Sequence, residues 1–236
     1  MISKDKRIRI MIGHYGSGKS EFSMNYVTKL RELVDTKVAI SDLDIVNVYF
    51  RTREKRDFLQ SKNILPIDSS VQATSLDLPA VSAQVTGPIT DKTYNYVVDV
   101  GGDDVGARVL GRFSHLIEED DYDMFCIVNA NRENTQTAQD VIKHIKSIEY
   151  TSKLKVTGLI SNTHLVRETT IDDILKGQSL VKEVSNLTNI QISFLKSQPK
   201  CHHYYFLHVL IFLFLSLSQG HVLWYVDSPT LLPTFL

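Results

Sequence analysis

The sequence predicts an α/β domain with a mostly parallel central sheet covered by helices on both faces. Short apolar runs alternate with longer amphipathic stretches over residues 8–195, as in strands joined by crossover helices. A glycine-rich stretch, residues 13–18, separates the first apolar run from the first amphipathic one. Aspartates close two later runs, at Asp42 and Asp99. Because parallel strands place their carboxyl ends at one edge of the sheet, we expect the glycines and these aspartates to meet there.

Length and composition fit a single soluble domain with its own core. Of the 236 residues, 43% are hydrophobic and 22% are charged. The formal net charge of −1 gives no overall attraction to nucleic acid or anionic lipid. Cys126 and Cys201 form no C-x-x-C pair, which disfavours a disulfide framework and a zinc site. The N-terminus has no apolar signal-peptide core, and a cytoplasmic location is predicted.

The periodicity of apolar residues assigns strands and helices in chain order. The expected strands are residues 8–12, 37–41, 96–100, 124–130, 156–162 and 190–194. The expected helices are residues 20–34, 105–117, 134–149 and 170–187. Thr169 or Thr170 would cap the last of these helices, which has acidic residues in its first turn. Residues 64–96 are mixed and carry turn residues, so no element is assigned there.

The glycine-rich stretch has the spacing of a phosphate-binding loop. Residues 13–20, GHYGSGKS, match the pattern G-x-x-x-x-G-K-[ST] between an expected strand and an expected helix. Gly13, Gly16 and Gly18 let the backbone curl so that several N–H groups point at one anion, and the following helix start adds further donors. The residues expected to bind the nucleotide phosphates are Gly13, His14, Tyr15, Gly16, Ser17, Gly18, Lys19, Ser20 and Glu21.

Charged and hydroxyl side chains are expected to complete a site for Mg²⁺ and phosphate. Lys19 can reach the β- and γ-phosphates, and the Ser20 hydroxyl can ligate Mg²⁺. Asp99 stands where such a fold holds Mg²⁺ through a bound water, with a helix N-cap or turn role as the alternative. Asp42 and Asp44 could orient the attacking water or contact Mg²⁺, or could lie in a solvated loop. We predict Lys19 and Asp44 as catalytic residues and Ser20, Asp42 and Asp99 as metal ligands.

Two asparagines indicate the choice of base. Guanine-specific loops typically carry an Asn-Lys-x-Asp run, and the sequence has none. Asn162 follows an expected strand and could hydrogen-bond an adenine edge, with Asn129 as a second candidate. ATP is therefore preferred to GTP. The basic residues Arg51, Arg53 and Arg56 could contact phosphate or a partner, or could form a solvated face.

The last stretch of the chain, residues 201–236, breaks the α/β pattern. We therefore assign residues 1–200 to an ATP-binding domain and treat residues 201–236 as an atypical hydrophobic tail. Residues 201–226 contain no Asp, Glu, Lys or Arg. The stretch could associate with a membrane, form a buried element or partner interface, or not belong to the native domain end, as after a shifted reading frame. The membrane anchor is the weaker reading because basic flanks and an amphipathic face are missing. This stretch contains four residues whose side chains can bind a metal ion, and their spacing matches no known metal site; they are Cys201, His202, His203 and His208.

Four stretches resemble the MinD/ParA-like branch of the P-loop ATPases, of the SIMIBI class, and within it small uncharacterised bacterial ATP-binding proteins. They are GHYGSGKS, SDLDIVNVYFR, VVDVGGDDVGAR and GLISNTHL, and the likeness covers residues 7–195. The resemblance implies a P-loop NTPase three-layer sandwich with a seven-stranded or similar parallel sheet, Mg·ATP as ligand and, often, an ATP-dependent homodimer. Matched by position, it implies that Lys19 and Ser20 serve phosphate and Mg²⁺, that Asp44 orients water beside Asp42, that Asp99 is the switch II aspartate, and that Asn162 contacts adenine.

One residue departs from that family. These ATPases typically carry a signature lysine just after the first loop glycine, which reaches the nucleotide of the partner subunit, and His14 occupies this position. A histidine is shorter and mostly neutral at pH 7, so it replaces a fixed positive charge poorly. The departure weakens the case for dimer-coupled hydrolysis and leaves nucleotide binding untouched.

The sequence therefore predicts a cytoplasmic Mg·ATP-binding protein that hydrolyses ATP slowly or acts as a nucleotide-dependent switch, with an unidentified protein partner. In this hypothesis the nucleotide state switches the loops around Asp44 and Asp99. Two alternatives stay open. One is an ATP-gated scaffold or regulator with little turnover, and the other is a small-molecule kinase or ligase with an acceptor pocket near residues 75–90.

Overall fold

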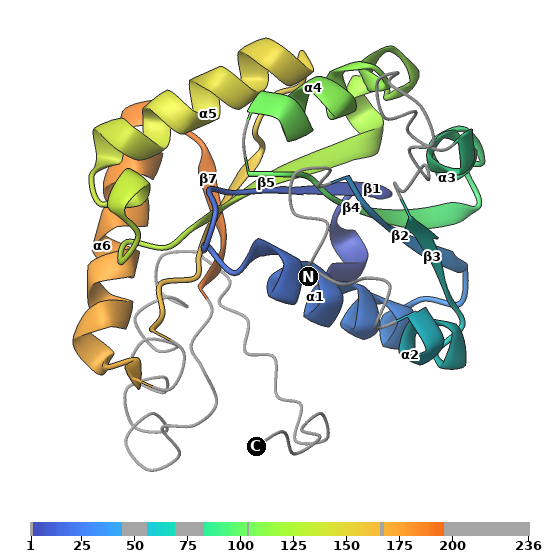
Figure 1. Cartoon of the computed structure of the whole chain (residues 1–236), viewed down its shortest axis with the longest axis horizontal. Coiled ribbons are helices and arrows are strands. Elements are labelled where there is room, and N and C mark those ends of the chain that lie inside the picture. The colour runs from blue at the N-terminus through green and yellow to red at the C-terminus, as the bar shows by residue number, and fades with distance from the viewer. Residues whose placement is uncertain (1, 44–55, 69–82, 103, 166–167, 196–236) are drawn as a thin grey trace, which may run out of the picture.

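The computed structural model describes residues 2–43, 56–68, 83–102, 104–165 and 168–195, and every structural statement below concerns them. Seven strands form one sheet in the order β3-β2-β4-β1-β5-β6-β7, and every neighbouring pair is parallel (Figure 1). The strands are β1 (Ile8–Ile12), β2 (Lys37–Asp42), β3 (Ile64–Asp68), β4 (Tyr94–Asp99), β5 (Tyr122–Val128), β6 (Gly158–Ser161) and β7 (Gln191–Leu195).

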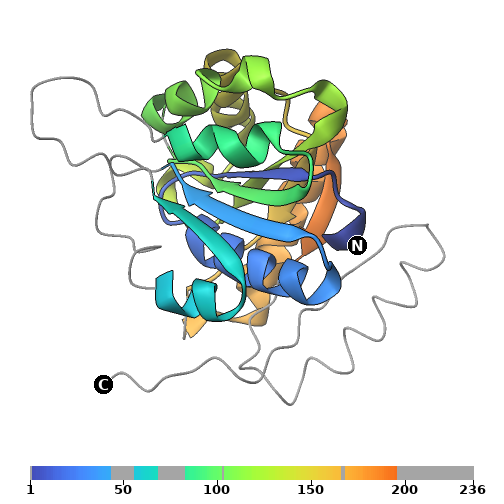
Figure 2. The same cartoon turned by 90° about the vertical axis from the view of Figure 1, so that its right-hand side faces the viewer.

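Helices cover both faces of this sheet, which confirms the predicted α/β three-layer architecture. The helices are α1 (Lys19–Leu33), α2 (Arg56–Ser61), α3 (Thr86–Thr90), α4 (Asp104–Gly111), α5 (Ala138–Ser152) and α6 (Ile171–Thr188). Figure 2, seen from the β3 edge, shows α4 on one face of the sheet and α1 and α2 on the other. The long helices cover strands buried on both faces, as parallel crossovers require.

The core consists of two apolar clusters, one on each face of the sheet. Alternating residues of β1 divide between them: Ile10 joins the cluster made with α4, α5 and α6, and Met11 joins the cluster made with α1. All five residues of β1 are buried, since this strand lies at the centre of the sheet. The central strand is therefore a fixed support for the loop that follows it.

Local chemistry explains where the elements depart from the expectations. Strand β3 is absent from the sequence assignment; it contains Pro66, which is tolerated because β3 lies at the sheet edge. Helix α5 begins at Ala138, later than expected, because the Thr137 side chain caps it by accepting from the Asp140 N–H. The predicted Thr170 cap is confirmed, as part of a reciprocal capping box.

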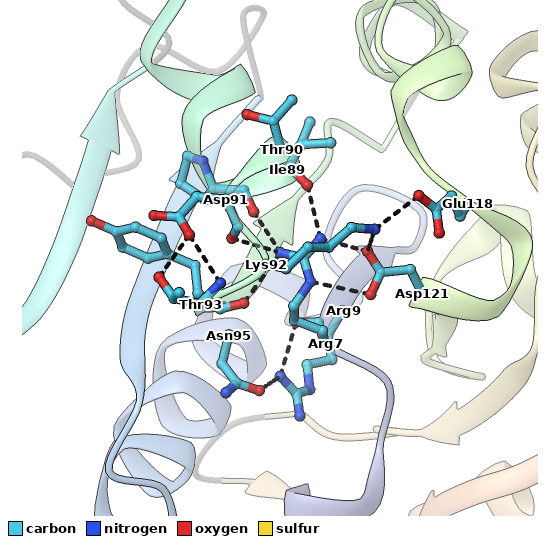
Figure 3. Close-up of polar contacts among 12 residues, drawn as sticks. Arg7, Arg9, Ile89, Thr90, Asp91, Lys92, Thr93, Asn95, Glu118 and Asp121 are labelled. Atoms are coloured by element: carbon cyan, nitrogen blue, oxygen red, sulfur yellow. Dashed lines mark hydrogen bonds and ion pairs between the residues drawn. The ribbon is translucent and has the colours of Figure 1, made fainter.

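Arg7 joins three elements at the end of the sheet where β1 begins (Figure 3). Its guanidinium donates to the carbonyl oxygens of Pro88 at 2.6 Å and Ile89 at 2.8 Å, in α3. Its Nε donates to Asp121 Oδ1 at 3.1 Å, just before β5. Lys92 adds a second cation to the same carboxylate at 3.0 Å. Carbonyls that a short helix leaves unpaired are thereby satisfied.

None of the described helices is long and apolar enough to cross a membrane.

Candidate nucleotide-binding site

The loop between β1 and α1 has the backbone that the phosphate-binding motif requires. Gly16 and Gly18 have φ angles of 78° and 79°, in the left-handed region that glycine adopts without strain. The Ser17 N–H donates to the His14 carbonyl at 3.0 Å and closes a turn. Helix α1 then starts at Lys19, so its first N–H groups lie at the end of the loop. The loop thus has the glycine conformations and the helix start that the motif needs, and binding of an anion by its N–H groups stays a prediction.

Lys19 and Asp99 form a buried ion pair beside this loop. The Lys19 Nζ lies 2.6 Å from Asp99 Oδ1, and the two side chains are 7% and 6% exposed. Strands β1 and β4 are neighbours with Met11 and Asp99 in register, so Asp99 stands next to the loop, where the sequence placed it. A charge pair of this kind is costly to break on one side only, because the remaining charge stays buried without its partner.

Ser20 and Asp42 stand at the same edge of the sheet. Asp42 closes β2 and is the register partner of Asp99 on β4. The Leu43 N–H donates to the Asp99 carbonyl at 2.7 Å and fixes the two strand ends together. Ser20 is the second residue of α1, and its side chain, like that of Asp42, is half-buried. Hydroxyl and carboxylate oxygens are the donor types that Mg²⁺ prefers, so this set fits the ion chemically.

Two asparagines predicted to contact adenine hold the phosphate loop. The Asn162 amide donates to the Ser17 carbonyl at 2.7 Å, and the Asn129 amide donates to the carbonyls of Gly16 and His164 at 3.3 and 3.2 Å. Both side chains are buried. These bonds tie the loop to the ends of β5 and β6. Contact of Asn162 with a base stays a prediction.

Arg132 belongs to the site although the sequence analysis did not single it out. Its Nε donates to the Gly16 carbonyl at 3.0 Å, so that Gly16 accepts from two side chains of the segment after β5. Its position four residues beyond the end of a central strand, at the ligand edge of the sheet, is the signal that could have identified it.

The remaining residues of the predicted site have different surroundings. The rings of His14 and His144, a residue of α5, meet edge to face with centroids 5.5 Å apart. Tyr15 is 78% exposed, and Glu21 is exposed in the first turn of α1. Gly102, after β4, packs against the loop so closely that an added Cβ would lie 2.7 Å from the Gly13 carbonyl oxygen. The segment after Asp99 and the phosphate loop are therefore in direct contact.

Several sequence-based predictions fall outside the described residues. These are the catalytic role of Asp44, the basic residues Arg51 and Arg53, the half of the expected acceptor region 75–90 that lies at residues 75–82, and the stretch 201–236. They stay predictions.

Comparison with known proteins places the fold. No model of a protein family matches the sequence, and no curated protein matches it. Among solved structures, chloroplast FtsY from Physcomitrella patens aligns with a TM-score of 0.55 at 14% identity, over 81% of this chain and 59% of that one. FlhF complexed with GTP and Mg²⁺ aligns with a TM-score of 0.51 at 13% identity, over 80% of this chain and 64% of that one. The signal recognition particle receptor FtsY from Elizabethkingia anophelis, in complex with GDP, aligns with a TM-score of 0.50 at 12% identity, over 80% of this chain and 56% of that one.

This chain thus spans less than two thirds of the length of each of these structures. At such low identity the likeness shows the fold alone. That fold is the α/β three-layer sandwich of P-loop NTPases, as the sequence predicts. A place in the MinD/ParA-like branch stays a prediction.

Proposed function

We propose that this protein binds Mg·ATP and acts as a slow ATPase or nucleotide-dependent switch of the MinD/ParA-like type. The observation that carries the proposal is the buried pairing of Lys19 with Asp99 next to a glycine-rich loop at the start of a long helix. The loop supplies N–H donors for an anion, and Lys19 supplies the charge. The neighbours complexed with GTP and Mg²⁺ or with GDP support a nucleotide as the ligand of this fold.

The ion pair gives the switch a physical basis. Phosphate oxygens would compete with the Asp99 carboxylate for the Lys19 ammonium, because Lys19 reaches the phosphates in the proposed complex. Asp99 would then be released from Lys19, and the segment through Gly102, which packs on the loop, would respond to the change. A ligand shifts such an equilibrium by the difference between its affinities for the two arrangements.

Mg²⁺ would be held by Ser20 and by the carboxylates of Asp99 and Asp42. The ion usually keeps several waters and binds through one or two carboxylates together with substrate phosphates. One hydroxyl and two carboxylates are consistent with this coordination. When bound, Mg²⁺ neutralises charge on the phosphates. Asp44 is proposed to orient the attacking water. Slow turnover is expected because His14 lacks the fixed charge of the family's signature lysine.

ATP is proposed rather than GTP because of the segment after β5. It reads Asn129-Ala130-Asn131-Arg132 and lacks the aspartate of an Asn-Lys-x-Asp run. Guanine presents N–H groups that donate hydrogen bonds to such a carboxylate. Arg132, in its place, can only donate.

Nucleotide competition and phosphate release test this proposal. We expect unlabelled ATP to displace a fluorescent ATP analogue at lower concentration than GTP does, and we expect slow, Mg²⁺-dependent phosphate release from ATP. Tight binding without release would favour the scaffold alternative, and ADP formation only with an added acceptor would favour a kinase. If GTP competes better than ATP, the assignment of the base is wrong.

A further inference from the structure

Exposed cations gather on the outer surface of helices α4 and α5. We call this surface the basic face; it consists of Arg108, Arg112, Lys143, Lys146 and Lys153. The lysines are spaced by three and seven residues along α5 and its C-cap, so they project from one side of the helix. None of the five residues forms a salt bridge with a described carboxylate.

The two helices that carry the basic face are in contact. Helices α4 and α5 lie side by side on the same face of the sheet (Figure 1). A Cβ added to Gly111, the last residue of α4, would lie 2.7 Å from the Thr151 carbonyl oxygen, near the end of α5. Because Arg112 follows Gly111 directly, the cations of the two helices share one surface.

The carboxylates of α5 do not neutralise this surface. Glu149 accepts from the Lys155 Nζ and from the Val156 N–H, both at 3.0 Å, beyond the end of the helix. Asp140 accepts from the Thr137 hydroxyl at 2.6 Å, at the N-terminal cap. Helix α5 contains no other Asp or Glu. Since the whole chain has a net charge of −1, the positive charge here is a local concentration and not a general excess.

Tyr150 adds an aromatic ring to the basic face. It is 79% exposed, and the Lys153 Nζ lies 4.3 Å from the centroid of its ring. Tyrosine and arginine are enriched where proteins bind one another, because the aromatic ring supplies contact area at low entropic cost and the charges select the partner. The composition of the surface therefore suits a protein partner of opposite charge.

An acidic stretch limits how far an anionic partner can extend. The exposed residues 118–120, Glu-Glu-Asp, come just before Tyr122, whose hydroxyl accepts from the Lys155 N–H at 2.8 Å, close to the end of α5. From Lys143 to Lys153 the basic face is about 15 Å long. A nucleic-acid duplex or an anionic membrane is charged over a much longer surface and would bring phosphates against the acidic stretch. A compact acidic patch would avoid it.

We propose that the basic face binds an acidic patch on a partner protein. The Asp and Glu side chains of the partner pair with the cations of α4 and α5, and Tyr150 packs between them. Because the face is small and its charges are exposed, the complex is of the transient, salt-sensitive kind. None of these residues belongs to the candidate nucleotide-binding site, so the inference is independent of the proposed function.

Fluorescence anisotropy of labelled decaglutamate, at low salt, tests the inference on the full chain. We expect saturable binding that is lost at about 1 M salt, where the Debye length is about 3 Å. K143E/K146E should weaken binding at least about tenfold, because two attractive charges become repulsive. A DNA duplex and vesicles that contain phosphatidylserine are titrated in parallel and should bind more weakly than decaglutamate.

The matched control is K4E/K62E, which makes the same change in charge at two exposed lysines beside α1 and α2, on the other face of the sheet (Figure 2). It should bind decaglutamate as the unchanged protein does. If K143E/K146E does not fold, as judged by circular dichroism, R108E/R112E replaces it. Absence of decaglutamate binding, or equal weakening in the control, overturns the inference. Tighter binding of DNA or of vesicles, lost in K143E/K146E, would assign the face to nucleic acid or membrane and also overturns it.

Discussion

The ion pair between Lys19 and Asp99 is the residue-scale basis of the proposed switch. Both side chains are almost completely buried, and they are 2.6 Å apart at the point where β1 and β4 end together. Each charge is tolerated there because of the other. A nucleotide that takes Lys19 away from Asp99 must therefore bring its own compensation, which the phosphates and Mg²⁺ provide in the proposed complex.

Replacing Asp99 by Asn tests this dependence. We expect D99N to lower the free energy of unfolding of the nucleotide-free protein by about 3 kcal/mol, because Lys19 would keep a buried charge without its partner. Urea unfolding followed by circular dichroism measures the change. Mg·ATP should offset part of the loss, since bound phosphates again pair with Lys19.

The control for D99N is D120N, at an exposed position next to β5, where a change below about 0.5 kcal/mol is expected. A loss in D99N no larger than in this control would show that the pair does not hold the site together.

At this scale the sequence predicts contacts between residues of recognisable motifs, and it does not predict contacts between residues that only the folded chain brings together. The meeting of Lys19 and Asp99 follows from two strand ends on one edge of a parallel sheet, so it could be predicted. The contact of Arg132 with Gly16 joins residues 116 positions apart and has no signature spacing. The amide of Asn162 was predicted at this edge, but its bond to the Ser17 carbonyl is visible only in the structure.

At the scale of elements, Arg7 connects β1 with α3 and with the segment before β5, at the end of the sheet away from the candidate nucleotide-binding site. Burial alone would raise the pKa of Asp121, but the hydrogen bonds from Arg7 and Lys92 outweigh it and hold the pKa below the usual 3.8. Because the pKa is lower in the folded than in the unfolded protein, the stabilisation is present above about pH 3.8 and is lost as the pH falls through the folded value.

D121N is therefore expected to be less stable than the unchanged protein by about 2 kcal/mol near neutral pH, the size of hydrogen bonds to a charged group. The difference in unfolding free energy should shrink as the pH falls from about 3.8 through the lower pKa of the folded protein, because the Asp121 carboxyl group then takes up a proton. Urea unfolding at a series of pH values measures it, with the exposed neighbour variant D120N as control. A difference that does not change with pH would contradict the account.

Element boundaries were predictable where caps and periodicity agree. The Thr170 capping box marks the start of α6 in the sequence and in the structure. Strand β3 was missed because a strand of five residues containing a proline gives almost no periodic signal. Helix α3 was missed for a related reason, since its Gly87 and Pro88 are typical of turns.

At the scale of the whole molecule, the two core clusters are built from residues between Ile2 and Val184, with partly buried contacts up to Ile192. The described sheet ends with β7 (Gln191–Leu195). We therefore expect a chain that ends at residue 200 to unfold cooperatively, with a Tm within a few degrees of that of the whole chain, since the loss of a few tenths of a kcal/mol shifts Tm only slightly. Thermal unfolding followed by circular dichroism checks this.

A chain that ends at residue 190 is the matched control. It lacks β7, which pairs with β6 over four residue pairs, and it should be clearly less stable. Failure of the longer chain to fold would show that residues beyond 200 belong to the core.

The parallel sheet was predictable as a whole because apolar runs and helical stretches alternate, and each parallel connection needs a crossover. The assignment to the MinD/ParA-like branch stays a prediction, because it depends on a few residues whose roles differ between families. His14 is the clearest of them, and in the structure its ring lies against His144 of the same chain.

Calorimetric titration of the full chain and of its K19A variant with Mg·ATP tests the central claim most directly. Lys19 is the charged residue that the phosphates are proposed to take from Asp99. The account predicts saturable binding of one Mg·ATP per chain, weakened by at least about a hundredfold in K19A, as for the loss of a charged contact worth close to 3 kcal/mol. Absence of binding at millimolar Mg·ATP, or equal affinity in K19A, would contradict it.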